Sequence, residues 1–193
     1  MRTLADQLTR YAAYHRDRRN IACHFVGIPA IYAAVVILLS RPVFFEVGGV
    51  PISPAVLVGI AALAYDLVLD WALGAVMVVL TFICWRGGAV LAAGPMSLWL
   101  GVGLGLFVAG WAVQFVGHAF EGRKPAFLDD LVGLLIGPLF IVAEAGFALG
   151  WRPELERDIE GGAGPTRIGR PVAATPSTPA VTPPDRTAGL KGG

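Results

Sequence analysis

The chain has 193 residues, of which 55% are hydrophobic and 15% are charged, and its formal net charge is +1 at pH 7. Soluble domains carry about 25% charged residues, so this composition indicates an integral membrane protein rather than a soluble enzyme. The near-zero net charge provides no basic surface and argues against a nucleic-acid partner.

The chain begins with a polar segment, Met-Arg-Thr-Leu-Ala-Asp-Gln-Leu-Thr-Arg. It lacks the continuous apolar run of a cleavable signal peptide, and we expect it to form an amphipathic helix on the membrane surface. This helix should end near His15. The polar Arg18-Arg19-Asn20 then predicts a turn, with Asn20 capping a membrane helix that starts at Ile21.

Five apolar runs follow and predict about five hydrophobic helices. A membrane-spanning helix needs about 20 apolar residues. The second and third runs are too long together for one span, and Asp66 and Asp70 lie at their junction. Because an acid at the bilayer centre costs about 2.5–3.5 kcal/mol, we expect two tightly connected spans with both acids near a membrane face. The runs are residues 24–39, 52–69, 71–85, 97–116 and 131–149.

The fifth run contains Pro138 between Gly137 and Leu139, and it also holds Glu144. Proline removes a helix hydrogen-bond donor, and a buried acid needs a partner. This run is therefore either a kinked span or a re-entrant hairpin. From Gly161 onward the chain is rich in Gly, Pro and Thr without hydrophobic periodicity, which predicts a membrane domain over residues 1–160 and a disordered tail over residues 161–193.

Basic residues set the expected orientation. They cluster before the first span and after the fourth, and the positive-inside rule places both segments in the cytoplasm. Four spans between them return His118 to the side of His15 and His24, whereas three spans would leave it on the opposite face. Because the Ala/Gly/Val/Arg-rich composition is typical of bacteria, we expect the inner membrane. The basic residues are Arg2, Arg10, Arg16, Arg18, Arg19, Arg123 and Lys124.

The chain has three histidines, and each lies among polar residues at the end of an apolar run. Imidazole is a common ligand of catalytic transition metals, and several ligands must converge from separate segments. Tyr11 lies one helical turn before His15. Taken one at a time, His15, His24 and His118 are equally consistent with ordinary interfacial residues, but together they predict a metal site.

A polar stripe surrounds the last histidine. Gln114, His118 and Glu121 lie four and three residues apart, so they share one helix face, and Gly117 allows close approach of another helix. The alternative is an ordinary polar cap at the membrane surface. Asp70 is either a ligand or acid–base group paired with Asp66, or part of a simple turn. Glu144 either accepts a hydrogen bond from a ligating histidine or makes a helix-packing contact.

Three motifs combine these residues. The first is Tyr-x3-His-x4-Asn-x3-His-x2-Gly-x-Pro from Tyr11 to Pro29, and the second is Trp-x2-Gln-x2-Gly-His-x2-Glu-x3-Pro-Ala from Trp111 to Ala126. The third is Gly-Pro-x-Phe-x3-Glu, from Gly137 to Glu144. Over residues 4–155 the chain resembles the fungal 2-hydroxy-palmitate dioxygenase family.

This resemblance implies an Fe(II)-dependent membrane enzyme of fatty acid α-oxidation. It would cleave a long-chain 2-hydroxy fatty acid with O₂ to the acid one carbon shorter, without 2-oxoglutarate, with the acyl chain lying between apolar spans beside membrane lipid. The physiological substrate, its chain length and the formation of a homo-oligomer are left open.

The expected site residues fall into four groups. His15, His24 and His118 are the metal ligands, and Glu121 or Asp70 could add a carboxylate. The remaining catalytic groups are Tyr11, Asn20, Gln114 and Glu121. The substrate carboxylate would be held by Arg16, Arg19 or Lys124. Asp70 and Glu144 would support the ligands from behind.

Two other functions fit the residues alone. One is a different metal-dependent lipid enzyme with the same ligands, such as a zinc hydrolase. The other is a non-enzymatic transporter or assembly protein that uses its polar residues for helix packing. The lack of an internal repeat weighs against a transporter built from inverted halves.

Overall fold

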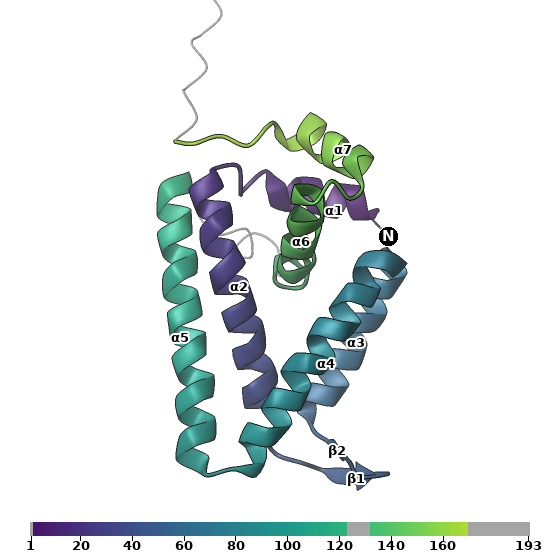
Figure 1. Ribbon diagram of the computed structural model, residues 1–193, viewed down its shortest axis with the longest axis vertical. Coiled ribbons are helices and arrows are strands. Elements are labelled where there is room, and N and C mark those ends of the chain that lie inside the picture. Colours follow the sequence, from purple (N-terminus) through teal and green to yellow (C-terminus); the bar gives the residue numbers. More distant parts are fainter. Residues whose placement is uncertain (1, 123–131, 170–193) are drawn as a thin grey trace, which may run out of the picture.

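The computed structural model describes residues 2–122 and 132–169 (Figure 1). The predicted all-α membrane architecture is confirmed, with an amphipathic first helix followed by five hydrophobic helices and a seventh, polar helix. The elements are α1 (Leu4–Ala12), α2 (Arg18–Leu39), β1 (Phe45–Val47), β2 (Val50–Ile52), α3 (Pro54–Leu69), α4 (Trp71–Ala93), α5 (Met96–Glu121), α6 (Gly133–Ala148) and α7 (Pro153–Ala163).

Helices α2 to α5 run alternately up and down one bundle, so the end of α5 returns to the start of α2 (Figure 1). By length and composition, α2, α4 and α5 can each cross a membrane, while α3 is shorter at 16 residues. Helices α1 and α7 lie at one end of the bundle, and the hairpin of β1 and β2 lies at the other (Figure 1). This arrangement brings the two histidine-bearing segments to the same end.

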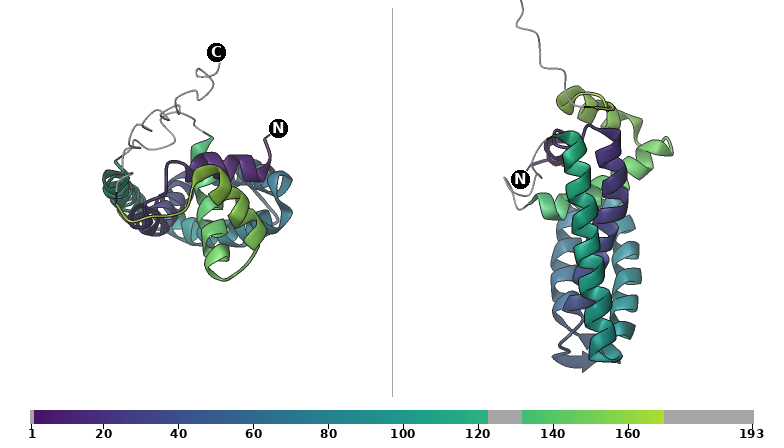
Figure 2. Two further views of the ribbon diagram at one scale, coloured as in Figure 1. Left: turned by 90° about the horizontal axis from the view of Figure 1, so that it is seen from above. Right: turned by 90° about the vertical axis from the view of Figure 1, so that its left-hand side faces the viewer.

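Helix α6 differs from the other hydrophobic helices because it lies across the bundle rather than along it (Figure 2). It continues through Pro138 without a break, and the chain turns by 117° between α6 and α7. Beneath α1, its apolar residues form a core with Leu8 and Tyr11 of α1, Leu73 of α4 and Ile159 of α7. The bend between α6 and α7 is compatible with both expected arrangements, a kinked span and a re-entrant segment.

Glycines spaced by seven residues let α5 pack closely against α2. A Cβ atom would lie 2.6 Å from Leu38 Cδ2 at Gly103, 2.7 Å from Ile31 Cγ1 at Gly110, and 2.5 Å from Asn20 Oδ1 at Gly117. Van der Waals packing is a main source of helix association in membranes, where the lipid is as apolar as the side chains. The glycines therefore hold α2 and α5 in fixed register.

The predicted turn before α2 is real, but its cap is misplaced by three residues. Helix α2 begins at Arg18, and Asp17 caps it by accepting a hydrogen bond from the Arg19 main-chain N–H at 2.9 Å. Hydrogen bonds from the Arg19 side chain hold the pKa of the Asp17 carboxyl well below its usual range. Asn20 lies inside the first turn of α2, where its side chain donates a hydrogen bond to Glu121 instead of capping the helix.

The connection between α3 and α4 is as tight as expected. Asp70 caps α4 by accepting hydrogen bonds from the main-chain N–H groups of Ala72 and Leu73, at 3.1 and 2.9 Å. It also forms an ion pair with Arg152. Asp66 is buried one turn earlier.

The ordered chain continues past the expected start of the tail at Gly161. Helix α7 extends to Ala163, and residues 164–169 make hydrogen bonds to the segment between α1 and α2. Residues 170–193, which make up most of the expected tail, lie outside the described part of the chain. The structured region therefore reaches at least residue 169.

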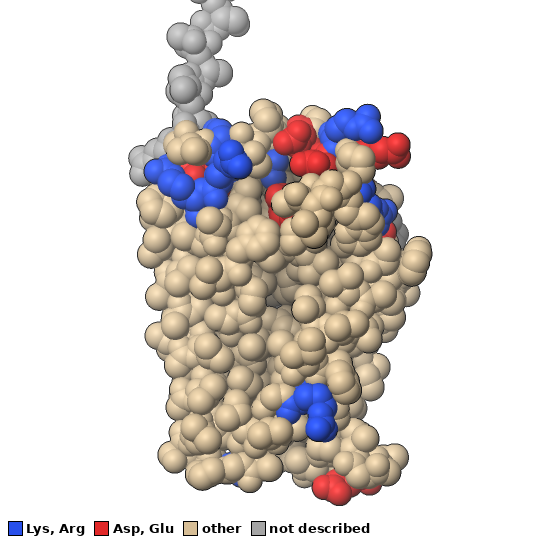
Figure 3. All heavy atoms as spheres, viewed as in Figure 1, with Lys and Arg blue, Asp and Glu red and all other residues tan. Residues whose placement is uncertain are grey.

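Charged side chains gather at the end formed by α1 and α7, and a wide uncharged belt covers the middle of the bundle on the face shown in Figure 3. A belt of this kind matches the hydrocarbon layer of a membrane. On this face, the histidine-bearing end is consequently the end with more charged side chains.

Candidate metal centre

Three histidine rings meet at the polar end of the bundle. His15 lies in the turn between α1 and α2, His24 lies near the start of α2, and His118 lies in the last turn of α5. They retain only 1%, 1% and 6% of their exposed surface, and their candidate ligand nitrogens all lie within 4.8 Å of one another. No other such cluster occurs among the described residues.

Two of the rings are oriented by main-chain carbonyls one helical turn earlier. His15 Nδ1 lies 2.7 Å from the Tyr11 carbonyl oxygen, and His24 Nδ1 lies 2.9 Å from that of Asn20. With the proton on Nδ1 in each hydrogen bond, both Nε2 atoms keep a free lone pair. This arrangement fixes the tautomer in the way typical of metal-ligating histidines.

Unsatisfied nitrogens in this cluster fit a metal ion. His15 Nε2 and His118 Nδ1 are buried and have no hydrogen-bond partner among the described residues. Burial and the neighbouring imidazole of His24 hold the pKa of His15 well below its usual range, so this ring is neutral at pH 7. A buried polar atom without a partner costs free energy, and a bound cation would remove that cost.

Glu121 connects the turn that carries His15 to the end of α5. Its carboxylate is buried, and Oε2 accepts hydrogen bonds from the main-chain N–H groups of Arg16 and Asp17 at 3.0 and 2.7 Å. Asn20 Nδ2 donates to the same oxygen at 3.2 Å, and Arg167 Nη2 donates to Oε1 at 2.9 Å. Both oxygens are thus engaged by protein donors.

Aromatic packing holds the His15 ring from one side. Tyr11 stacks on it with ring centres 4.2 Å apart and an angle of 11°, and Phe140 of α6 packs against Tyr11 at 4.9 Å.

Gln114 lies one turn before His118, buried at the contact with α2, and its Oε1 has no hydrogen-bond partner among the described residues. The expected catalytic residues therefore all lie close to the histidines in sequence or in space.

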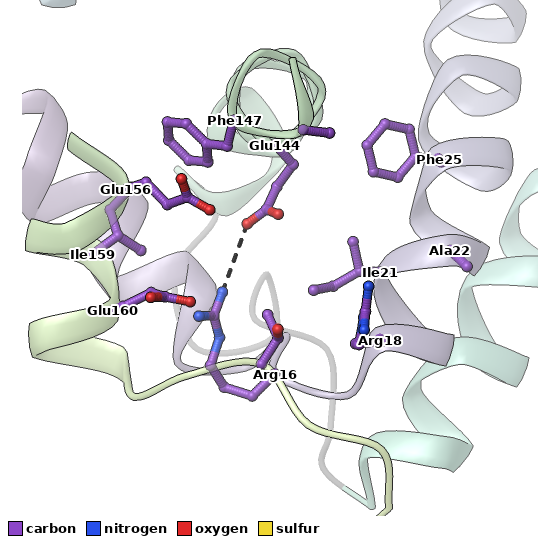
Figure 4. A pocket seen from close by; sticks show the side chains of 12 residues that line it. Arg16, Arg18, Ile21, Ala22, Phe25, Glu144, Phe147, Glu156, Ile159 and Glu160 are labelled. Atoms are coloured by element: carbon purple, nitrogen blue, oxygen red, sulfur yellow. Dashed lines mark ion pairs between the residues drawn. The ribbon is translucent and has the colours of Figure 1, made fainter. Parts of the chain in front are cut away.

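The expected substrate-binding and supporting residues are arranged differently. Arg16 is buried, donates to the carbonyl oxygens of Ala12, His15 and Gly164, and lies 3.7 Å from Glu144 (Figure 4). Glu144 therefore pairs with an arginine, and among the described residues no hydrogen bond joins it to any of the three histidines.

The remaining expected residues are not part of the histidine cluster or lie outside the described chain. Arg19 forms an ion pair with Asp17 and lies over the Phe120 ring at 4.7 Å. Asp70 binds Arg152 at the start of α4 and does not belong to the histidine cluster. Lys124 lies outside the described residues.

Two residues of this centre escaped the sequence reasoning. Asp17 lies inside the first motif, at one of the four positions between His15 and Asn20 that the motif leaves open, and its place before an apolar run was an available capping signal. Arg167 lies in a segment rich in glycine and proline, where no periodicity marks it.

An apolar cavity of about 390 Å³ begins at the histidine cluster and extends along the bundle. Tyr11 and His118 line one end, and Leu39 of α2 and Ala55 of α3 line the other. A second cavity of about 360 Å³ lies between α2, α6 and α7, with Arg16 and Glu144 in its wall (Figure 4). The first has the length and apolar surface to accommodate a lipid chain.

Comparison with known proteins gives two matches. A family model described as "2-hydroxy-palmitic acid dioxygenase Mpo1-like" matches residues 1–149. The chain is 31% identical over 159 residues to the 2-hydroxy-palmitic acid dioxygenase MPO1 of Saccharomyces cerevisiae. The aligned region covers 81% of this chain and 87% of the yeast protein. No solved structure matches the chain.

Proposed function

Because the chain belongs to the Mpo1-like family of 2-hydroxy-palmitic acid dioxygenases, we propose that it is an Fe(II)-dependent dioxygenase of fatty acid α-oxidation. It would convert a 2-hydroxy fatty acid and O₂ to the acid one carbon shorter, CO₂ and water. The substrate supplies all four electrons that reduce O₂ in this reaction. No 2-oxoglutarate is needed for that balance.

The buried histidine cluster is the observation that carries this proposal. Its neutral nitrogens suit iron, and three protein ligands leave positions for other groups. Iron bound there would supply oxygen activation and a binding site for the hydroxyl and carboxylate oxygens of the substrate. Tyr11 and Asn20 would keep two of the rings in the ligating tautomer, since their carbonyl oxygens accept from Nδ1. Glu121 would hold the end of α5, which carries His118, against the turn that follows His15, because it accepts hydrogen bonds from main-chain N–H groups of that turn.

The apolar cavity supports a lipid substrate. It starts at His118, so an acyl chain lying in it would leave the hydroxy acid end beside the histidines. Arg16 is buried and paired with Glu144 and main-chain carbonyls, whereas Arg19 pairs with Asp17 but keeps 45% of its side chain exposed. Of these two arginines, Arg19 is therefore the better candidate to bind the substrate carboxylate. We place the site at the cytoplasmic face of the inner membrane, on the basis of the basic residues near it.

Oxygen uptake by protein purified and loaded with Fe(II) under anaerobic conditions tests this function. We expect consumption of O₂ with 2-hydroxypalmitate and formation of the 15-carbon acid, without added 2-oxoglutarate. Palmitate, which lacks the hydroxyl group, should give neither. His118→Ala is the matched control and should be inactive. Stoichiometric zinc together with no O₂ uptake would favour a hydrolase instead.

A further inference from the structure

A short segment after α7 crosses the turn that carries His15. We call residues 164–169 the C-terminal strap. Arg167 N donates to the Arg16 carbonyl oxygen, and Arg18 N donates to the Arg167 carbonyl oxygen, both at 2.8 Å. Gly169 N also donates to Asp17 Oδ2 at 2.9 Å. The strap lies outside residues 1–149, the region that matches the family.

The strap also supplies the cation for a buried carboxylate. Glu121 has no exposed side-chain surface, and Arg167 is the residue that forms an ion pair with it among the described residues. The other donors to this carboxylate are neutral N–H groups of Arg16, Asp17 and Asn20. A buried charge without a counter-charge is strongly unfavourable, so removing the guanidinium would disturb the position of Glu121.

Glu121 links two of the three histidines. It lies three residues after His118 on α5, and it binds the main-chain N–H groups of the two residues that follow His15. The position of its carboxylate therefore sets the spacing between His15 and His118. A shift of Glu121 would therefore act on both segments, because Glu121 belongs to α5 and is hydrogen-bonded to the two residues after His15.

We propose that Arg167 is a positioning residue of the metal centre. By pairing with Glu121 it fixes the spacing of His15 and His118, so the strap completes a site whose ligands all lie in the family region. This inference rests on the proposed metal site at the histidines.

The test uses Co²⁺ binding to full-length protein, measured by titration and by the visible absorption of the bound metal. Loss of a group that orients metal ligands lowers affinity by about 10- to 100-fold, and we expect about tenfold for Arg167→Ala because it acts through Glu121. The absorption spectrum should change as well. Arg167→Lys, which keeps the charge, should restore part of the affinity.

Arg157→Ala is the matched control. Arg157 lies on exposed α7 and donates only to the Pro153 carbonyl of its own helix, so this variant should bind Co²⁺ like wild type. Because Glu121 loses its counter-charge, Arg167→Ala should also unfold at a lower temperature than Arg157→Ala in the metal-free state. The absorption spectrum at saturating Co²⁺ therefore separates positioning from general stability. A wild-type spectrum of the bound metal in folded Arg167→Ala would overturn the proposal.

A double-mutant cycle tests whether Arg167 affects metal binding through Glu121. In a Glu121→Gln background, the further change Arg167→Ala should have no additional effect on Co²⁺ affinity, because the two residues act as one unit. Additive effects would contradict the proposal, as would wild-type affinity in Arg167→Ala. Failure of the wild-type protein itself to bind Co²⁺ would instead refute the metal site and the proposed function.

Discussion

The three histidines are oriented by different means. His15 and His24 each use a carbonyl four residues earlier, so helical spacing alone sets the partner of Nδ1. His118 depends on the register of α5 against α2, which the glycine contacts determine. The hydrogen-bond partners of His15 and His24 can be predicted from helical spacing in the sequence. The register of α5 against α2, which positions His118, cannot be predicted in this way.

Replacing each histidine with alanine should remove bound metal and activity. His15→Ala, His24→Ala and His118→Ala should nevertheless reach the membrane in normal amount, because the apolar spans drive insertion. Iron content of the purified variants and their amount in the membrane fraction give the two readings. A variant that keeps stoichiometric iron would show that its histidine is not a ligand.

Gly117→Ala should damage the centre through packing alone. The new Cβ atom would lie 2.5 Å from Asn20 Oδ1 and 2.9 Å from Cys23 Cβ, which forces α2 and α5 apart beside His24 and His118. Overpacking of this kind costs about 1–3 kcal/mol, and we expect a lower unfolding temperature in detergent and weaker metal binding. Gly105→Ala on the same helix meets no atom within 4 Å and should behave like wild type. Equal behaviour of the two variants would contradict this packing argument.

The five hydrophobic helices could be predicted because each is a long apolar run, but two features of the elements could not. The hairpin of β1 and β2 depends on a turn in which Gly48 and Gly49 both have positive φ, and its signal is only Val-Gly-Gly-Val between short strands. Helix α6 has the same composition as a spanning helix, so hydropathy gives no sign that it lies across the bundle. Its direction is set by packing under α1, which is a tertiary effect.

The cavity between α2, α3 and α5 should control chain-length preference. Ala62 lines it, about two helical turns above Ala55 at the far end. Since lipid is as apolar as the cavity wall, preference must come from shape rather than from burial. Ala62→Leu should therefore lower turnover of 2-hydroxypalmitate relative to 2-hydroxydecanoate by about tenfold, the low end of what a hydrophobic pocket achieves per methylene.

The neighbouring residue provides the control for this prediction. Ala61 is exposed and does not line the cavity, so Ala61→Leu should leave the ratio of the two turnover rates unchanged. A ratio that is also unchanged in Ala62→Leu would place the acyl chain elsewhere.

At the scale of the whole molecule, α2 to α5 alternate in direction and bring His24 and His118 to one end, which predicts an even number of crossings between them. We expect Arg2→Cys to be labelled by a membrane-impermeant thiol reagent from the cytoplasmic side only, and Glu46→Cys, in the hairpin, from the opposite side only. Both changes are made in a Cys23→Ala, Cys84→Ala background, which removes the native thiols. Labelling of both positions from the same side would contradict the arrangement of α2 to α5.

The meeting of the three histidines could be predicted from the whole chain, because span count and basic residues require the same topology. The role of Arg167 could not be predicted in this way. Its segment, Gly-Gly-Ala-Gly-Pro-Thr-Arg-Ile-Gly, carries no hydrophobic pattern, and its order comes from hydrogen bonds to Arg16, Asp17 and Arg18. Sequence reasoning finds segments that bury apolar surface, and the strap is held by polar contacts instead.

The long separation of the ligands along the chain has a consequence for biosynthesis. A growing chain that ends after α4 carries His15 and His24 but not His118, and Arg167 is translated later still. Because synthesis proceeds from the N-terminus, no nascent chain has a complete centre until α5 has joined α2. A metal ion could therefore be held by all three histidines only in a nearly finished protein, and ribosome-bound fragments would not carry the complete proposed site into the surrounding lipid.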